Sequence, residues 1–291
     1  MSRLAFYSGL FITSLVWPGL ALAQGHDGQA HSATAIPDFS GGWARIGDLV
    51  EMFEAIPGHT GGGPMLVDPE YPHAQGGVGE ELRWVADLDN PILQPATLEK
   101  LRVITEAELR GIPHVKDEGV CQPSGVPMLL NRRGGAIQIL QTPTQITILN
   151  ARDHQVRFAY LDVPHSANPG HSWYGESVAH YEGSDTLVID TIGQNDKTQI
   201  DRFGTPHSEQ LHVIERYTLS PDGQALEVQF TVVDPIAFTM PWSGRVRFRN
   251  RPTDWDEQIC AENNRHVGTV TFNGVLMTDE VPTPTDETPD F

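Results

Sequence analysis

The sequence predicts an all-β fold: an antiparallel β-barrel with a loop-rich N-terminal extension and one helix. Three observations predict it. From Gly134 onward, apolar and polar residues alternate with the period of two that is typical of strands. Two pairs of these runs form hairpins around short polar turns. About eight to ten such strands follow one another along the chain, as in a barrel or a sandwich.

The first residues are typical of a signal peptide, which we expect over residues 1–23. Arg3 supplies a positive charge, Leu4–Leu22 is apolar, and Ala21-Leu22-Ala23 is a small-x-small cleavage pattern. A membrane anchor is the alternative, since the apolar stretch is nearly long enough to span a bilayer. The break at Pro18-Gly19 favours cleavage. We therefore expect a periplasmic or secreted protein without stable membrane insertion.

Composition divides the remaining chain into three parts. Residues 24–36 are expected to be a disordered leader, residues 37–280 a single β-barrel domain, and residues 281–291 a flexible tail. The chain carries 38 acidic and 19 basic residues, a formal net charge of −19. Because a phosphate backbone would repel so acidic a chain, we expect no nucleic-acid partner.

The chain contains two cysteines, Cys121 and Cys260. Export to an oxidising compartment favours a disulfide between them, and two buried thiols are the alternative. They form no C-x-x-C motif, so a redox function is not indicated.

The elements of the domain are expected in the following order. Residues 44–95 are rich in Gly and Pro and lack periodicity, which is typical of a long loop over a scaffold. An apolar face predicts a helix from Ala96 to Arg110. Strands are expected at residues 136–140, 145–149, 156–161, 172–181, 186–192, 211–219, 226–233, 245–249 and 268–276.

The second hairpin places a carboxylate on an apolar face. A loop of Ser220–Gly223 makes Leu219 face Gln224, and Glu215 then lies on the core face together with Tyr217. A carboxylate among apolar groups must be paired, hydrogen-bonded or raised in pKa. Two interpretations stay open: Glu215 is a general acid or base, or it pairs with a buried Arg or Tyr and stabilises the barrel.

The first hairpin places ionisable groups on both of its faces. Pairing Glu182 with Asp185 makes Ser177 face Asp190. Which face points into the barrel stays open. One face holds Trp173, Ser177, Tyr181 and Asp190, while the other holds Glu176 and His180.

Histidines gather in the loops that precede these hairpins. If both loops open at one barrel end, His165, His171, His207 and Glu209 converge there. Such a cluster would be a proton relay, or a metal site of imidazole and carboxylate ligands. The absence of H-E-x-x-H and H-x-H motifs makes metal the minor alternative.

Two resemblances support this interpretation. Gly41-Gly42-Trp43 resembles the G-x-W motif that begins lipocalin-like (calycin-like) barrels. That resemblance implies that Trp43 closes the barrel floor and that Arg245, Arg247 or Arg249 packs over it.

Longer blocks are similar to a family of uncharacterised exported bacterial proteins. This chain has Gly183-Ser184-Asp185 where that family usually has an uninterrupted Gly-Asp. The resemblance implies no established activity. The matching blocks are Pro37–Trp43 (PDFSGGW), Cys121–Pro127, Gly170–Thr191, Pro206–Arg216 (PHSEQLHVIER), Asp234–Trp242 and Cys260–Arg265.

Together these observations favour an exported enzyme that performs cofactor-free acid–base chemistry on a small apolar or aromatic molecule in a barrel pocket. The reaction would be of the lyase, hydratase, isomerase or cyclase type. The alternatives are a non-catalytic periplasmic protein that binds a hydrophobic ligand, and a metal-dependent enzyme. The catalytic candidates are Glu215, Asp190, His180, His207 and His171, and the substrate-binding candidates are Trp173, Tyr181, Ser177, Trp242 and Tyr217.

Overall fold

The computed structural model describes residues 36–47, 52–71, 85–112, 114, 121–131, 136–150, 155–251, 270–272 and 275–277. The predictions for the signal peptide, for the leader up to residue 35, for Cys260 and for the tail 281–291 lie outside these ranges. Within them, no helix is both long enough and apolar enough to cross a membrane.

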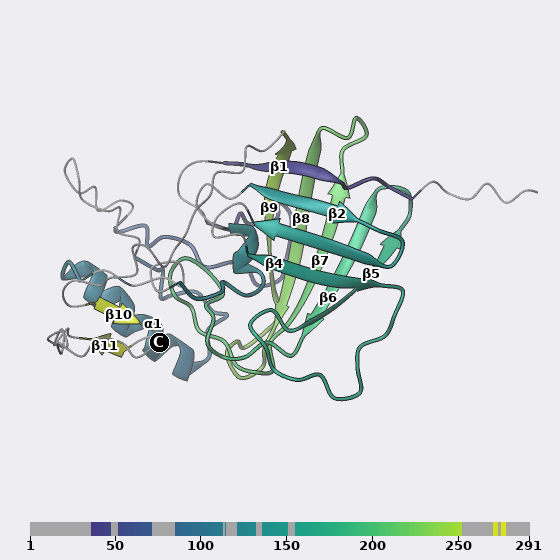
Figure 1. Ribbon diagram of the computed structural model, residues 1–291. Helices are drawn as coiled ribbons and strands as arrows, with labels where there is room; N and C mark the ends of the chain where they lie inside the picture. Colours follow the sequence, from purple (N-terminus) through teal and green to yellow (C-terminus); the bar gives the residue numbers. More distant parts are fainter. Residues whose placement is uncertain are drawn as a thin grey trace, which may run out of the picture. The chain divides into compact units, whose positions relative to one another are not determined.

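The described part of the chain forms a closed barrel of the strands β1 to β9, which confirms the predicted all-β fold (Figure 1). Neighbours in sequence pair with each other, and β1 also pairs with β9, which closes the barrel. All pairs are antiparallel except β4 with β5, which is parallel. The strands are β1 (Gly41–Ile46), β2 (Ile137–Gln141), β3 (Gln145–Asn150), β4 (Val156–Leu161), β5 (Glu176–Glu182), β6 (Thr186–Ile192), β7 (His212–Leu219), β8 (Ala225–Val233) and β9 (Trp242–Asn250).

The hairpin of β7 and β8 has the predicted inner face. Glu215 and Tyr217 both point into the barrel and are fully buried. The pairing differs from the prediction by two residues, because Leu219 pairs with Leu226 and not with Gln224. Side chains along a strand alternate with a period of two, so an even shift keeps the same residues inside.

The predicted register of the hairpin of β5 and β6 was wrong by one residue. Ser177 pairs with Thr191 instead of Asp190, because the turn takes three residues, Gly183–Asp185, with Gly183 at a φ of 64°. An odd shift moves one whole strand to the opposite face. Ser177 therefore points inward, while Asp190 lies on the outer wall of the barrel.

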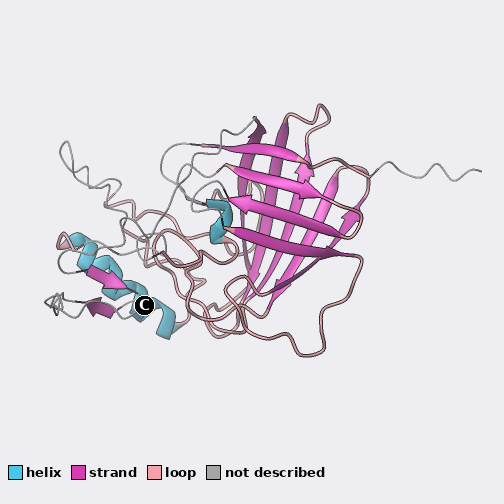
Figure 2. Ribbon diagram, viewed as in Figure 1, coloured by secondary structure: helices cyan, strands magenta, loops and turns pink. Residues whose placement is uncertain are grey.

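Helix α1 (Pro95–Leu109) confirms the predicted helix, and Pro95 occupies the first turn, where its missing N–H costs nothing (Figure 2). The single strand predicted at residues 268–276 was wrong. That segment instead holds two short strands, β10 (Val270–Phe272) and β11 (Val275–Met277), which pair with each other outside the barrel and contact α1.

The N-terminal extension packs against the barrel end where β6 ends and β7 begins, here called the loop end. Gly62 bridges to Trp242 so closely that a Cβ on Gly62 would lie 2.8 Å from side-chain atoms of Ile92 and Trp242. The side-chain amide of Gln194 accepts from the backbone N–H of Val126 at 2.8 Å and donates to its carbonyl at 3.0 Å. These contacts fix the segments that cover the loop end.

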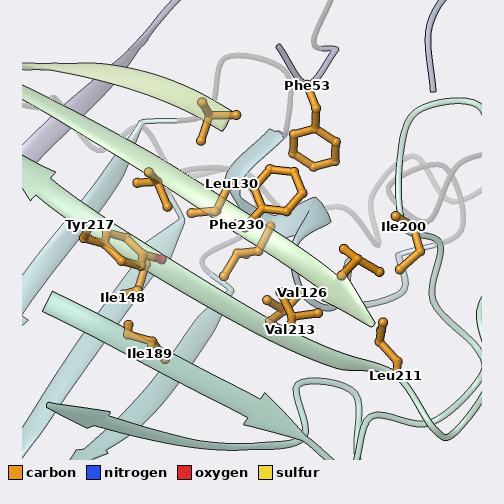
Figure 3. Packing of buried hydrophobic residues seen from close by; sticks show 14 of the residues in the cluster. Phe53, Val126, Leu130, Ile148, Ile189, Ile200, Leu211, Val213, Tyr217 and Phe230 are labelled. Carbon is orange, nitrogen blue, oxygen red and sulfur yellow. The ribbon is translucent and has the colours of Figure 1, made fainter. Parts of the chain in front are cut away.

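The core is continuous from the barrel into these covering segments. Figure 3 shows Val126 and Leu130, from the segment before β2, beside Val213 and Phe230 of the barrel wall. All four side chains are at most 2% exposed. The covering segments therefore stabilise the barrel through apolar burial as well as through backbone hydrogen bonds.

The lipocalin-like arrangement of a Trp under an Arg is not present at the predicted residues. Trp43 is buried, and its indole N–H donates to the carbonyl of Phe39 at 2.9 Å. Arg245 and Arg247 instead pair with Glu54, and Arg249 is exposed. The inward positions of β9 alternate with these arginines, so all three lie on the outer face.

Candidate functional site

The candidate side chains fall into three separate places: the barrel interior, the outer wall, and a pocket at the loop end. Three aromatic candidates lie apart from any common cavity. Trp242 packs between Phe230 and Phe238, with ring centroids 5.8 Å apart in each pair. Tyr181 stacks on Phe39. Trp173 lies under the ammonium of Lys197 at 5.9 Å.

A polar cluster centred on Arg157 occupies the barrel interior. Its Nη2 lies 2.6 Å from Oε2 of Glu215, and the hydroxyl of Tyr217 donates to Oε1 of the same carboxylate at 3.0 Å. The guanidinium also donates to Ser177 Oγ at 3.1 Å and to Thr191 Oγ1 at 2.5 Å. Three of the predicted site residues are thus brought together, but around an arginine that the sequence did not identify.

This cluster is a structural element of the barrel. Glu215 and Tyr217 are 0% exposed and Arg157 is 2% exposed, which leaves no water-sized space beside them. Burial and the Glu215 carboxylate raise the pKa of Tyr217 well above its ordinary value, so its hydroxyl stays a donor. Of the two interpretations of Glu215, the structure supports the pairing with a buried Arg and Tyr. Asp190, the other carboxylate among the catalytic candidates, lies on the outer wall, so it does not share the barrel interior with Glu215.

A chain of carboxylates and imidazoles lies on the outer wall over β5, β6 and β7. Glu176 Oε1 is 2.9 Å from His165 Nδ1, and the other ring nitrogen of His165 is 2.9 Å from Asp190 Oδ1. The same Asp190 oxygen is 2.9 Å from His212 Nε2. His180 is not part of this chain, because it is exposed and pairs with Glu182 at 3.3 Å.

The carboxylates and imidazoles of this outer-wall chain shift one another's pKa values. The Asp190 carboxyl is partly desolvated, which raises its pKa, but hydrogen bonds from His212 and His165 outweigh burial and lower the pKa below the ordinary value. Hydrogen bonds from Ser166 lower the pKa of Glu176. The hydrogen bond to Asp190 raises the pKa of His212. The outer chain is thus most stable with its carboxylates ionised and His212 protonated.

A pocket of about 580 Å³ lies at the loop end. Its walls come from the start of α1, from the loops before β5 and β7, and from the turn between β8 and β9. The lining combines ionisable groups with small apolar ones: Ala96, Thr97, Lys100, His171, Asp196, Pro206, His207, Ser208, Glu209, Gln210, Ile236 and Ala237.

Two exposed side chains on the pocket wall form an ion pair. His171 Nδ1 lies 2.9 Å from Glu209 Oε1, with the two side chains 42% and 53% exposed. Lys100 lines the same pocket and forms no ion pair with a carboxylate of the described residues. Of the predicted cluster of His165, His171, His207 and Glu209, the pocket unites all but His165, which lies on the outer wall.

His207 is a buried part of this wall. Its Nδ1 donates to the carbonyl of Ser208 at 3.0 Å, and its Nε2 accepts from the hydroxyl of Thr198 at 2.7 Å. Burial lowers the pKa of His207 below its ordinary value. Both ring nitrogens are used, so the neutral ring positions the loop and has no nitrogen left for a substrate.

Asp234 holds the two loops of the pocket together, and the sequence did not identify it. Its carboxylate accepts from the backbone N–H of Ser208 at 2.6 Å and from the Ser208 hydroxyl at 2.8 Å. It also accepts from the backbone N–H groups of Ile236 and Ala237. An Asp followed by Pro predicts such a turn, but the tie to Ser208 is a tertiary contact.

The described residues contain no group of three or more His, Cys, Asp or Glu side chains placed to hold a metal ion. No protein-family model matches this chain, and no curated protein matches it.

Proposed function

We propose that the chain is an exported enzyme that performs cofactor-free acid–base chemistry on a small molecule bound in the loop-end pocket. The observation that carries this proposal is the pair of His171 and Glu209 on the pocket wall. A carboxylate beside one ring nitrogen orients the imidazole toward a substrate. Because Nδ1 faces Glu209, Nε2 is the nitrogen that would exchange a proton with the substrate.

The lining of the pocket favours a small organic anion as the substrate. Lys100, which forms no ion pair within the described residues, supplies a cation for a carboxylate or phosphate group. The side chains of Ala96, Ile236 and Ala237 suit a short apolar remainder. This proposal narrows the apolar or aromatic substrate expected from the sequence to one that carries a negative group. Three blocks of the proposed family resemblance contribute residues to this pocket: Gly170–Thr191, Pro206–Arg216 and Asp234–Trp242.

Lys100→Ala is expected to weaken binding of the anion about tenfold, since one charge-assisted hydrogen bond contributes about 1.5 kcal/mol. A thermal-shift panel of small carboxylates and inorganic phosphate would find a ligand, and calorimetry would measure its Kd. Arg110→Ala is the matched control, because it removes another exposed cation from the C-terminal end of the same helix. Equal weakening by both substitutions would reject the Lys100 contact.

Export and the disulfide belong to the same proposal. Expression in a bacterial host with its periplasm intact is expected to yield a chain that begins at Gln24 and holds Cys121 and Cys260 as a disulfide. Intact mass measured before and after reduction checks both. Cytoplasmic retention with an uncleaved N-terminus and two free thiols would contradict the proposal.

A further inference from the structure

The connection between β4 and β5, residues Asp162–Gly175, is here called the strap. Because β4 and β5 are parallel, the strap must run back along the barrel wall from one end to the other. At its start, the backbone N–H of Asp162 donates to the carbonyl of Ala179 at 2.9 Å. At its end, Ser172 bridges to Gln194.

The last residue of the strap is tightly fixed. Gly175 has a φ of 65°, and a Cβ at this position would lie 2.2 Å from the carbonyl oxygen of Ile192. Only glycine fits this approach between backbones. The two ends of the strap are therefore held by backbone contacts, and its middle depends on side chains.

The middle of the strap is held to the barrel by the outer-wall chain. The backbone N–H of Ser166 donates to Glu176 at 2.7 Å, and its hydroxyl donates to the other oxygen of that carboxylate. His165 lies between Glu176 on β5 and Asp190 on β6, with 2.9 Å contacts from both ring nitrogens. A neutral imidazole carries one N–H and a protonated one carries two, so only the protonated ring can donate to both carboxylates.

We propose that the outer-wall chain of carboxylates and imidazoles is a pH-dependent latch. It holds the strap against the barrel while its imidazoles are protonated and releases the strap as they lose their protons. His171 lies on the same strap, so release would separate it from Glu209 and open the pocket. This consequence for the pocket rests on the proposed function. The latch itself rests on the contacts of His165 and Ser166 with the barrel wall, and its pH dependence rests on His165.

The charged groups around the latch are few. Glu176, Asp190 and His212 face it from β5, β6 and β7, and Val233 of β8, opposite His212, carries no charge. His180 and Arg216 share this side of the barrel but both pair with Glu182. The strap contributes His165, Asp162 at its start, and His171, which pairs with Glu209. No other ion pair of the described residues competes for the two carboxylates.

The direction of the pH effect follows from the titrating groups. The pKa of His212 is raised in the folded protein, so its contribution is complete below the unfolded value and is lost as pH rises through the folded value. The pKa values of Glu176 and Asp190 are lowered, so their contribution is lost only as pH falls through those lowered values. His212 joins β7 to β6, so the strap itself depends on His165, whose ring donates to both carboxylates only when it is protonated. The latch is therefore closed in mildly acidic solution and opens toward alkaline pH.

Hydrogen–deuterium exchange of the full chain, without ligand, tests the latch. After correction for intrinsic exchange, the peptide covering residues 163–171 is expected to lose protection between pH 5.5 and pH 8.5, because a neutral His165 ring keeps one N–H and can donate to one carboxylate only. A peptide from β8 should change much less, which separates local opening from global unfolding.

Two variants assign the effect to His165. His165→Asn, which cannot titrate, should leave the strap equally weakly protected at both pH values. His180→Asn removes an exposed histidine outside the latch and should keep the wild-type pH dependence. If the first variant does not fold, Glu176→Gln replaces it and should flatten the same response. A pH-independent wild-type strap, or an unchanged response in His165→Asn, would overturn the latch whether or not the pocket binds a ligand.

Discussion

Replacing Arg157 with methionine is expected to lower the free energy of unfolding by about 3–5 kcal/mol, because Glu215 would be left as an unpaired charge in the barrel interior. The carboxylate would keep the hydroxyl of Tyr217 as a donor, which cannot replace a guanidinium. The hydroxyls of Ser177 and Thr191 would keep a hydrogen-bond partner, since they lie 2.9 Å apart and bond to each other. Urea unfolding at neutral pH measures the change.

The double variant Arg157→Met with Glu215→Leu is the control for this experiment. Removing both charges and filling the space with apolar side chains is expected to restore most of the lost stability. A loss below about 1 kcal/mol in Arg157→Met alone would show that water reaches Glu215, and the interior would again be a candidate site. Loss of function in Arg157→Met without loss of stability would also make the barrel interior a candidate site.

The two hairpins differ in how well their inward faces could be predicted from the sequence. In β7 and β8 the misplaced pairing of Leu219 was harmless, because a shift of two residues keeps Glu215 inside. In β5 and β6 the single extra turn residue placed Asp190 outside. The alternating pattern predicted the strands, while the exact turn geometry decided which carboxylate was buried.

The apolar pattern of β4 does not predict that Arg157 points into the barrel. Phe158 and Tyr160 share the face opposite Arg157, so apolar periodicity predicts that they point inward. Both are instead about half exposed, at 49% and 48%. The partner of Arg157 lies on β7, three strands away in the barrel order, and only the closed sheet brings the two together.

The pocket was anticipated in part. The sequence predicted that His165, His171, His207 and Glu209 would converge if both loops opened at one barrel end. All of them except His165 line one pocket. Lys100 could not be foreseen, because it comes from α1, distant in sequence and without a motif. The same holds for the tie between Asp234 and Ser208. Residues that line a pocket formed by loops are placed by tertiary contacts, which local patterns do not encode.

His171→Asn is expected to lower turnover of the pocket substrate by at least about a hundredfold while changing its Kd by less than about threefold, because general acid–base catalysis contributes about 10²–10⁴-fold. Acid–base chemistry at carbon exchanges a substrate proton with solvent. The ligand found in the thermal-shift panel would therefore be incubated with enzyme in D2O, and mass spectrometry would measure its deuterium uptake and any product.

Glu209→Gln and His180→Asn make this result specific. The first keeps the shape of the carboxylate but removes the charge 2.9 Å from His171, so turnover should fall by an intermediate factor. The second removes an exposed histidine outside the pocket and should leave turnover unchanged. Tight binding with neither deuterium uptake nor product in the wild type would favour the non-catalytic binding protein. Wild-type turnover in His171→Asn would show that another group moves the proton, because an asparagine amide cannot act as a general base at neutral pH.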